Sequence, residues 1–245
     1  MSSPFFRFKQ FQVWHDRCAM KVGTDGVLLG AWCPLPTREC VRVLDIGTGS
    51  GLIALMMAQR TCAVDSLQLI VNIDAIDIDG GAVEQAAYNF KQSPWAENLH
   101  AYQSSLQEWH SETKYDLIMS NPPYFQASLK NPDSQRATAR HTDTLSYGEL
   151  LAHASRLLTA DGTIALILPA DAEQEIVTLA REHALAVTRL TYVHSKPGKP
   201  VKRILIAFTP STTALPATQV AHFYIESDTA PRSEEYQALT REFYL

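Results

Sequence analysis

The chain predicts an α/β domain in which helices cover both faces of a mostly parallel sheet. From about Val41 onward, short β-branched or aliphatic runs alternate with segments that carry apolar residues at helical spacing. A glycine-rich turn follows the first of these runs, where such folds pass from strand to helix. A length of 245 residues and a hydrophobic content of 46% suit one large core. We therefore expect a single domain over residues 1–245.

The individual elements follow from their periodicity. We expect seven strands, at Val41–Ile46, Val71–Ile78, Leu99–Gln103, Tyr115–Ser120, Thr163–Leu168, Ala186–Tyr192 and Arg203–Phe208. Four helices with one apolar face are expected at Leu52–Gln59, Gly81–Lys91, Tyr147–Leu158 and Ala172–His183. Ser146 and Glu149 predict a capping box for the third helix. The polar stretches Phe125–Thr144 and Ser195–Lys202 are expected to be loops, the first one unusually long.

Composition limits the class of protein. The formal charge of -5 argues against a protein that coats nucleic acid through bulk charge, although it allows a local basic patch. The cysteines are scattered without a Cys-x-x-Cys pair, at Cys18, Cys33, Cys40 and Cys62. This pattern favours neither a metal site nor a disulfide framework, and it suits a reducing compartment. The first residues lack an apolar leader and no run of 18 apolar residues occurs, so we expect a cytoplasmic protein without a membrane segment.

The glycine turn is the first candidate binding site. The strand Cys40–Ile46 ends in Gly47-x-Gly49-x-Gly51, and a helix begins at Leu52. Glycines at this junction let the backbone turn sharply and bring a ligand against the peptide N–H groups of a helix N-terminus. The third glycine comes one residue earlier than in the dinucleotide fingerprint, and Asp45 stands inside the end of the strand. A turn that only tightens the packing of strand on helix is the alternative.

This departure resembles the first motif of class I methyltransferases. The resemblance implies that the glycines accommodate the methionine part of S-adenosylmethionine, and that Asp45 supports the turn and the cofactor amino group. Asp77, at the end of the second strand, suits both ribose hydroxyls, with Asp74 and Asp79 as competitors because a shift of one residue would exchange them. Many relatives place an acid after the third strand against the adenine, where this chain has Ser105, whose hydroxyl is a weaker acceptor.

Asn121-Pro122-Pro123-Tyr124 follows a strand directly, at the edge where open α/β sheets bind substrates. The prolines fix the backbone, so the Asn121 side-chain oxygen and the Pro122 carbonyl are held in place. These two acceptors suit the N–H groups of a planar amine, and Tyr124 suits stacking on its ring. We expect Asn121, Pro122 and Tyr124 to be catalytic, with Asn121 also at the cofactor. The motif does not separate adenine amines from glutamine amides or guanine amines.

The remaining motifs narrow the substrate. The run His15–Trp32, the segment Ser93–Glu97 and the tail Leu239–Tyr244 closely resemble bacterial tRNA(Val) adenine-N6 methyltransferases, the tRNA1(Val) (adenine-37-N6) family. That resemblance implies a Rossmann-like fold with seven strands, and transfer of a methyl group from S-adenosylmethionine to the adenine 3′ of the anticodon. It further implies that residues 1–38 cover a core at 39–210, followed by an extension at 211–245. Lys21, Thr24 and Asp25 are the contacts it implies from the covering segment.

The implied partner is the anticodon loop of tRNA, whose adenosine is splayed out more cheaply than a base in a duplex. Arg136 and Arg140, in the long loop, are the predicted RNA contacts, and Phe125 is a predicted second wall of the base pocket. Rival substrates are a release-factor glutamine, an rRNA guanine and a DNA adenine. A non-catalytic nucleotide-binding module is the rival of another class, and it leaves Asn121–Tyr124 unexplained.

Overall fold

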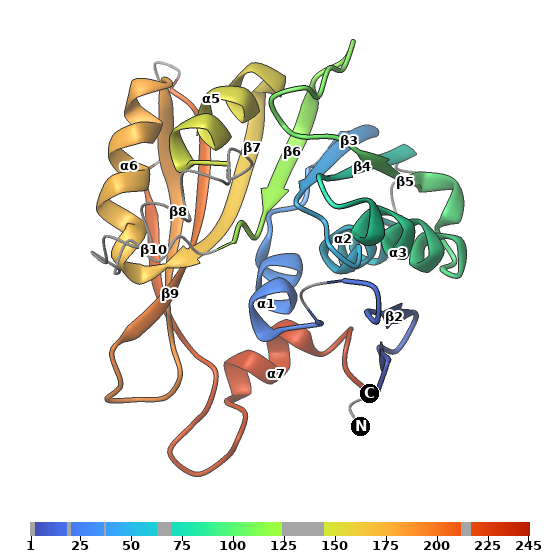
Figure 1. Ribbon diagram of the computed structural model, residues 1–245. Helices are drawn as coiled ribbons and strands as arrows, with labels where there is room; N and C mark the ends of the chain where they lie inside the picture. The colour runs from blue at the N-terminus through green and yellow to red at the C-terminus, as the bar shows by residue number, and fades with distance from the viewer. Residues whose placement is uncertain (1–2, 19–20, 37, 63–69, 124–144, 212–216) are drawn as a thin grey trace, which may run out of the picture.

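The computed structural model describes residues 3–18, 21–36, 38–62, 70–123, 145–211 and 217–245. Its centre is an eight-stranded sheet in the order β10-β8-β9-β7-β6-β3-β4-β5 (Figure 1). The strands of this sheet are β3 (Cys40–Ile46), β4 (Ile70–Asp77), β5 (Leu99–Gln103), β6 (Tyr115–Ser120), β7 (Leu158–Pro169), β8 (Leu185–His194), β9 (Val201–Pro210) and β10 (Gln219–Tyr224). All neighbours pair in parallel except β9, which is antiparallel to both β7 and β8. The carboxyl ends of the parallel strands therefore share one edge of the sheet.

Helices cover both faces of this sheet, as the sequence predicts. One face packs against α1 (Thr24–Trp32), α2 (Leu52–Cys62), α3 (Gly80–Lys91) and α7 (Glu234–Thr240), and the other against α5 (Tyr147–Leu157) and α6 (Glu173–Glu182). Successive strand residues point to opposite faces, so Val43 joins the first apolar cluster and Leu44 the second. The capping box is confirmed, because Ser146 accepts the Glu149 N–H and Glu149 accepts the Ser146 N–H. Short 3₁₀ turns occupy Ala96–Asn98 and Ala170–Ala172.

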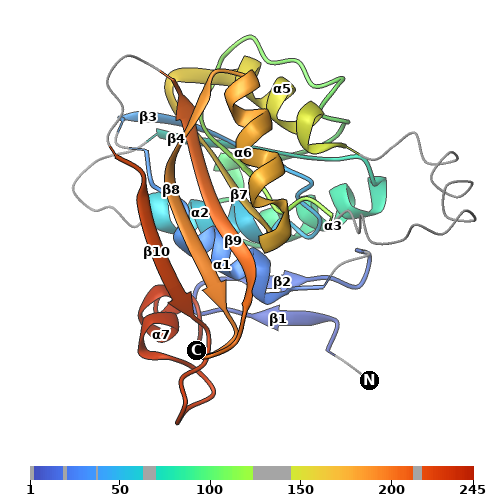
Figure 2. The ribbon, with the colours of Figure 1, turned by 90° about the vertical axis from the view of Figure 1, so that its left-hand side faces the viewer.

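All seven expected strands are present in the central sheet, which has eight strands in the described chain. The additional strand, β10, pairs in parallel with β8 at the outer edge of the sheet (Figure 2). Its first four residues are exposed, so it lacks the apolar face by which a strand is recognised in a sequence. β7 also begins earlier than expected, at Leu158 instead of Thr163. The turn-like residues 159–162 are part of this strand, and its pairing with β6 shifts register between Tyr115 and Leu117.

The segment around Lys9 is hydrogen-bonded to the carboxyl-terminal tail. The strands β1 (Phe5–Arg7) and β2 (Gln12–Trp14) form an antiparallel ribbon, which the sequence does not predict. The Lys9 N–H donates to the Phe243 carbonyl at 2.8 Å, and the Lys9 ammonium donates to the Arg241 carbonyl at 2.6 Å. The amino-terminal ribbon is thereby fixed to the carboxyl-terminal tail.

Candidate functional site

The glycine turn adopts a backbone that other residues rarely take. Gly47, Gly49 and Gly51 have φ values of +69°, +54° and +80°, in the left-handed region that favours glycine. A Cβ added at Gly47 or Gly49 would meet nothing within 4 Å, whereas a Cβ at Gly51 would lie 2.5 Å from Phe90 Cε1. The first two glycines therefore leave an open cradle, and the third lets α2 pack closely on α3. The geometry thus allows a ligand at the first two glycines and requires close packing at the third.

Asp45 supports the turn from the protein interior. Its side chain is fully buried, and Oδ2 accepts a hydrogen bond from the Thr48 hydroxyl at 2.7 Å. The other oxygen, Oδ1, is buried without a hydrogen-bond partner among the described residues. Burial raises the pKa of Asp45 to about 7, against the lowering effect of the Thr48 hydroxyl and the Ala54 peptide N–H. A buried carboxylate oxygen without a partner, directly below a ligand cradle, is suited to an N–H donor from a ligand.

The three acids near the end of β4 have different surroundings. Asp77 is half-buried, with Oδ2 accepting the Gly49 N–H at 2.9 Å and Oδ1 accepting the Asp79 N–H at 3.0 Å. Asp74 lies within the sheet, paired with Arg42 at 2.8 Å and hydrogen-bonded to the Tyr115 hydroxyl. Asp79 caps α3 through the Gly81 N–H. Asp77 is thus the acid that contacts the glycine turn. This position favours Asp77 over Asp74 and Asp79 as the residue for the ribose hydroxyls.

Asn121 and Pro122 directly follow β6, the strand next to β3. β3 and β6 pair with Ile46 opposite Ser120, so Gly47 and Asn121 are the first residues after two neighbouring strands. The Ser120 hydroxyl donates to the Ile46 carbonyl at 2.9 Å, which anchors the end of β6 to the start of the turn. Pro122 is buried and Asn121 half-buried. The other predicted residues of this region, Tyr124, Phe125, Arg136 and Arg140, lie outside the described residues.

The segment before Lys21 runs beside the same edge. Asn89 of α3, 1% exposed, joins it to the turn: its amide accepts the Trp14 N–H at 3.0 Å and donates to the carbonyls of Trp14 and Ser50, each at 2.8 Å. Further along, burial raises the pKa of Cys18 to about 11, with Asp77 as the next contributor, so Cys18 lies near the acid of the turn. No local pattern around Asn89 indicates these contacts, because its partners are far from it in the chain.

Lys21, Thr24 and Asp25 form the entry to α1. That helix packs on α2 through Gly26 and Gly30, where an added Cβ would lie 3.0 Å from Leu52 Cδ2 and 2.8 Å from Met56 Sδ. The close packing brings the start of α1 next to the start of α2. Lys21 and Thr24 are exposed, and the Asp25 carboxylate pairs with Arg203 Nε of β9 at 2.8 Å. Asp25 thus ties α1 to the strand ends through an ion pair.

Ser105 follows β5, close to Asp77. The Ser104 N–H donates to the Asp77 carbonyl at 3.0 Å, which places this turn beside the acid. The Ser105 hydroxyl is engaged locally, donating to a Glu108 carboxylate oxygen and accepting the Glu108 N–H, both at 3.2 Å. Ser105 therefore lies near Asp77, and its hydroxyl has a partner in the same turn.

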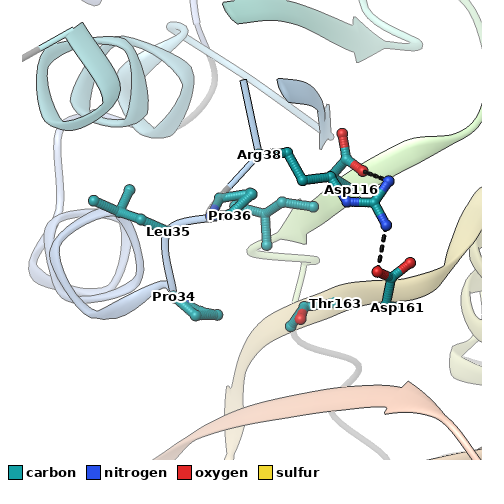
Figure 3. Close-up of a pocket in the computed structure, with 8 residues that line it drawn as sticks. Pro34, Leu35, Pro36, Arg38, Asp116, Asp161 and Thr163 are labelled. Atoms are coloured by element: carbon teal, nitrogen blue, oxygen red, sulfur yellow. Dashed lines mark hydrogen bonds and ion pairs between the residues drawn. The ribbon is translucent and has the colours of Figure 1, made fainter. Parts of the chain in front are cut away.

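A cavity of about 190 Å³ lies at the opposite edge of the sheet and belongs to no predicted motif. There Arg38 reaches between Asp116, at 3.5 Å, and Asp161 (Figure 3). These residues precede or begin the strands, so the ion pairs join strand starts far from the glycine turn. Within the described ranges, no group of three His, Cys, Asp or Glu side chains is placed to hold a metal. Nor is any helix of the described chain long and apolar enough to cross a membrane.

Known proteins are similar to this chain over most or all of its length. A family model described as the methyltransferase small domain matches residues 33–187. A tRNA1(Val) (adenine(37)-N6)-methyltransferase from Parabacteroides distasonis is 48% identical, with 100% of this chain and 99% of the relative covered. An enzyme of the same name from Bacteroides fragilis is 49% identical, again over 100% of this chain and 99% of the relative.

Solved structures share the fold at lower identity. A predicted O-methyltransferase from Agrobacterium tumefaciens is 15% identical, with a TM-score of 0.66 over 89% of this chain and 96% of that one. A putative class I S-adenosylmethionine-dependent methyltransferase from Listeria monocytogenes is 11% identical, with a TM-score of 0.57 over 80% and 62%. These likenesses confirm the predicted Rossmann-like, class I methyltransferase fold.

Proposed function

This chain belongs to the family of tRNA1(Val) (adenine(37)-N6)-methyltransferases, and we propose that it methylates the exocyclic N6 of adenine 37 in tRNA(Val) with S-adenosylmethionine as methyl donor. The observation that carries the proposal is the position of Asn121 directly after β6, next to the glycine cradle that follows β3. A donor site and an acceptor-lined substrate site thereby adjoin at one sheet edge. We place the enzyme in the cytoplasm, with its tRNA substrate.

The residues at the turn fit S-adenosylmethionine. The space above Gly47 and Gly49 admits a ligand against the backbone, and the partnerless Asp45 Oδ1 suits the N–H of an amino group. A carboxylate has about four acceptor sites, so Asp77 retains capacity for ribose hydroxyls beside its two peptide N–H partners. When bound, this cofactor supplies an electrophilic methyl group. We assign Gly47, Gly49, Asp45 and Asp77 to cofactor binding.

Lys21, Thr24, Asp25 and Ser105 are proposed as supporting contacts around the cofactor. The chain before Lys21 lies against α3, where the Arg17 N–H donates to Gln85 Oε1 at 3.1 Å, and this supports a role for Lys21 and Thr24 at the same edge. Asp25 supports the site by fixing the start of α1, because its carboxylate is paired with Arg203 of β9. Ser105 has an engaged hydroxyl, so any hydrogen bond to the adenine would require it to exchange its Glu108 partner.

The proposed chemistry depends on orientation. An exocyclic amine of adenine is a weak nucleophile because its lone pair is delocalised into the ring. The Asn121 side-chain oxygen and the Pro122 carbonyl would accept its two N–H groups, which favours a tetrahedral nitrogen with its lone pair directed at the methyl donor. The anchored Ser120 and the two prolines keep these acceptors fixed. The transfer would break the bond between sulfur and the methyl group and leave S-adenosylhomocysteine, and the methylated nitrogen would release one proton to solvent.

Replacing Asn121 by alanine tests the assignment. We expect the Asn121→Ala variant to lose about 10²–10³-fold in kcat, the range seen when one positioned hydrogen-bonding group is removed from an active site. Binding of S-adenosylhomocysteine, measured by calorimetry, should stay within about twofold of the wild type. Asn98→Ala is the matched control, since Asn98 hydrogen-bonds Val71 at the far edge of the sheet. Wild-type turnover by Asn121→Ala would refute the role of this residue.

A further inference from the structure

A rigid basic turn projects beyond the carboxyl edge of the sheet. The hairpin between β8 and β9 contains Lys196-Pro197-Gly198-Lys199, and the Lys199 N–H donates to the Lys196 carbonyl at 3.2 Å. Gly198 has a φ of +73°. Proline at the second position and a glycine of positive φ at the third are the signature of a type II turn. Both residues restrict the backbone, so the two lysines leave the turn from fixed positions.

Two histidines hold this turn onto the sheet. His194 Nδ1 lies 2.9 Å from the Lys199 carbonyl, and its Nε2 lies 2.9 Å from His222 Nδ1 of β10. A carbonyl only accepts, so Nδ1 of His194 must carry the proton, and a neutral His194 ring then accepts from His222. The His194 ring also stacks on Tyr224, with centroids 4.8 Å apart. The edge strand β10 thereby supports the conformation of the turn.

The charge of this surface is not neutralised by the described residues. Lys196, Lys199 and Lys202 are exposed, and none forms an ion pair within the part of the chain that the structure describes. The next basic residue, Arg203, differs in being paired with Asp25. Two carboxylates on neighbouring elements already accept hydrogen bonds, Glu173 from the Tyr192 hydroxyl at 2.9 Å and Glu235 from the Tyr224 N–H at 3.4 Å. Glu226 lies next to the hairpin, where its N–H donates to the Ser195 carbonyl at 2.9 Å, and its carboxylate forms no ion pair with the described lysines. Three unpaired ammonium groups therefore share one short hairpin in an acidic protein.

The hairpin and Asn121 both follow the carboxyl ends of strands, so they lie at the same end of the sheet. β8 is parallel to β6 and three strands away, a separation of about 14 Å at the usual spacing. Figure 1 shows the β8–β9 connection projecting past the ends of β6 and β7. A small substrate would not span this distance. A nucleic acid can contact both the hairpin and the Asn121 site, since protein–nucleic acid interfaces bury about 1,000 Å² or more of protein surface.

We propose that the Lys196–Lys199 turn, with Lys202, docks the phosphate backbone of the tRNA substrate while the target adenine occupies the Asn121 site. This inference rests on the proposed function, because it takes tRNA as the substrate. Ammonium groups act as point charges toward phosphate and carry no base specificity, so the turn contributes affinity and register. The site explains how a chain with a charge of -5 binds RNA.

The test compares two double variants in binding to a tRNA(Val) transcript over a range of salt. In Lys196→Ala/Lys199→Ala, we expect about tenfold weaker binding at low salt. Loss of two phosphate contacts should also reduce the slope of log K against log salt by about 1.4–1.8. The control, Lys91→Ala/Lys114→Ala, removes the same charge near the end of α3 and the start of β6, at the opposite edge. It should bind as the wild type does, and both variants should bind S-adenosylhomocysteine normally.

Gly198→Ala separates a fixed turn from bulk charge, since it keeps every lysine and places a Cβ where φ is positive. We expect it to weaken tRNA binding about threefold, and wild-type affinity would overturn the role of the turn geometry. Equal affinities and salt slopes for the two double variants would overturn the proposed docking site, with the methyltransferase assignment left standing. A wild-type enzyme that neither binds nor methylates tRNA would overturn the proposed function itself.

Discussion

Alanine substitutions at Gly49 and Gly51 separate ligand space from packing within one turn. Both residues have positive φ, so each alanine should cost about 1–2 kcal/mol of folding free energy from backbone strain. At Gly51 the new Cβ would also lie 2.5 Å from the Phe90 ring, and such overpacking adds about 1–3 kcal/mol. Gly51→Ala should therefore destabilise the protein by about 2–5 kcal/mol. At about 2–4 °C for each kcal/mol, its Tm should fall by roughly 4–20 °C, against 2–8 °C for Gly49→Ala.

The cofactor affinities should follow the opposite order. The Cβ of Gly49→Ala has no protein neighbour within 4 Å and enters the cradle, so the Kd for S-adenosylhomocysteine should rise at least about tenfold. Gly148→Ala, in α5, is the control, because the same change inside a helix should stabilise the protein by about 0.5–1 kcal/mol. Thermal unfolding and calorimetry give both quantities. Unchanged cofactor affinity in Gly49→Ala, or equal stability of the two turn variants, would refute the division of roles.

Three further outcomes follow from the same contacts. Asp77→Ala should weaken S-adenosylhomocysteine binding at least about tenfold, whereas Asp79→Ala should cost about 1 kcal/mol as a lost helix cap and leave that affinity unchanged; the reverse pattern would exchange their roles. Burial raises the pKa of Asp45 from 3.8 to about 7, so its stabilising effect is complete below pH 4 and is lost as the pH rises through 7. Asp45→Asn should flatten the decline of Tm between pH 4 and pH 7 in the cofactor-free protein, and an unaltered decline would contradict the assignment. Asn89→Ala leaves the Trp14 N–H and the Ser50 carbonyl without their partner, and a fall of about 1–3 kcal/mol in the free energy of unfolding is expected, with faster proteolysis before residue 18; a variant as stable and protease-resistant as the wild type would not fit.

Two strands have the bounds that the sequence predicts, although one is buried and the other is an edge strand. β6 is buried along its whole length, whereas β5 pairs only with β4 and ends in two exposed residues. Polar residues flank both strands and mark their ends. β10 escapes prediction because it is a largely exposed edge strand, paired on one side with β8. Its formation depends on a neighbour that periodicity cannot indicate.

Some parts of the candidate site are likewise predicted by the sequence, and others are not. Asp45, Gly49, Asp77 and Asn121 are predicted together because each lies at the carboxyl end of a strand, and parallel strands bring those ends to one edge. The link between Asn89 and Trp14 joins residues 75 positions apart, and that between His194 and His222 joins residues 28 apart. Such contacts depend on register and packing, which local patterns do not specify. The family resemblance predicted the substrate, and relatives with 48–49% identity support it.

The most direct test uses two tRNA(Val) transcripts that differ only in having adenosine or guanosine at position 37. The purified enzyme is incubated with each transcript and methyl-labelled S-adenosylmethionine, and the labelled nucleoside is identified and mapped. We predict N6-methyladenosine at position 37 of the first transcript and no label in the second. Equal labelling of both transcripts, or label in another nucleoside, would contradict the account.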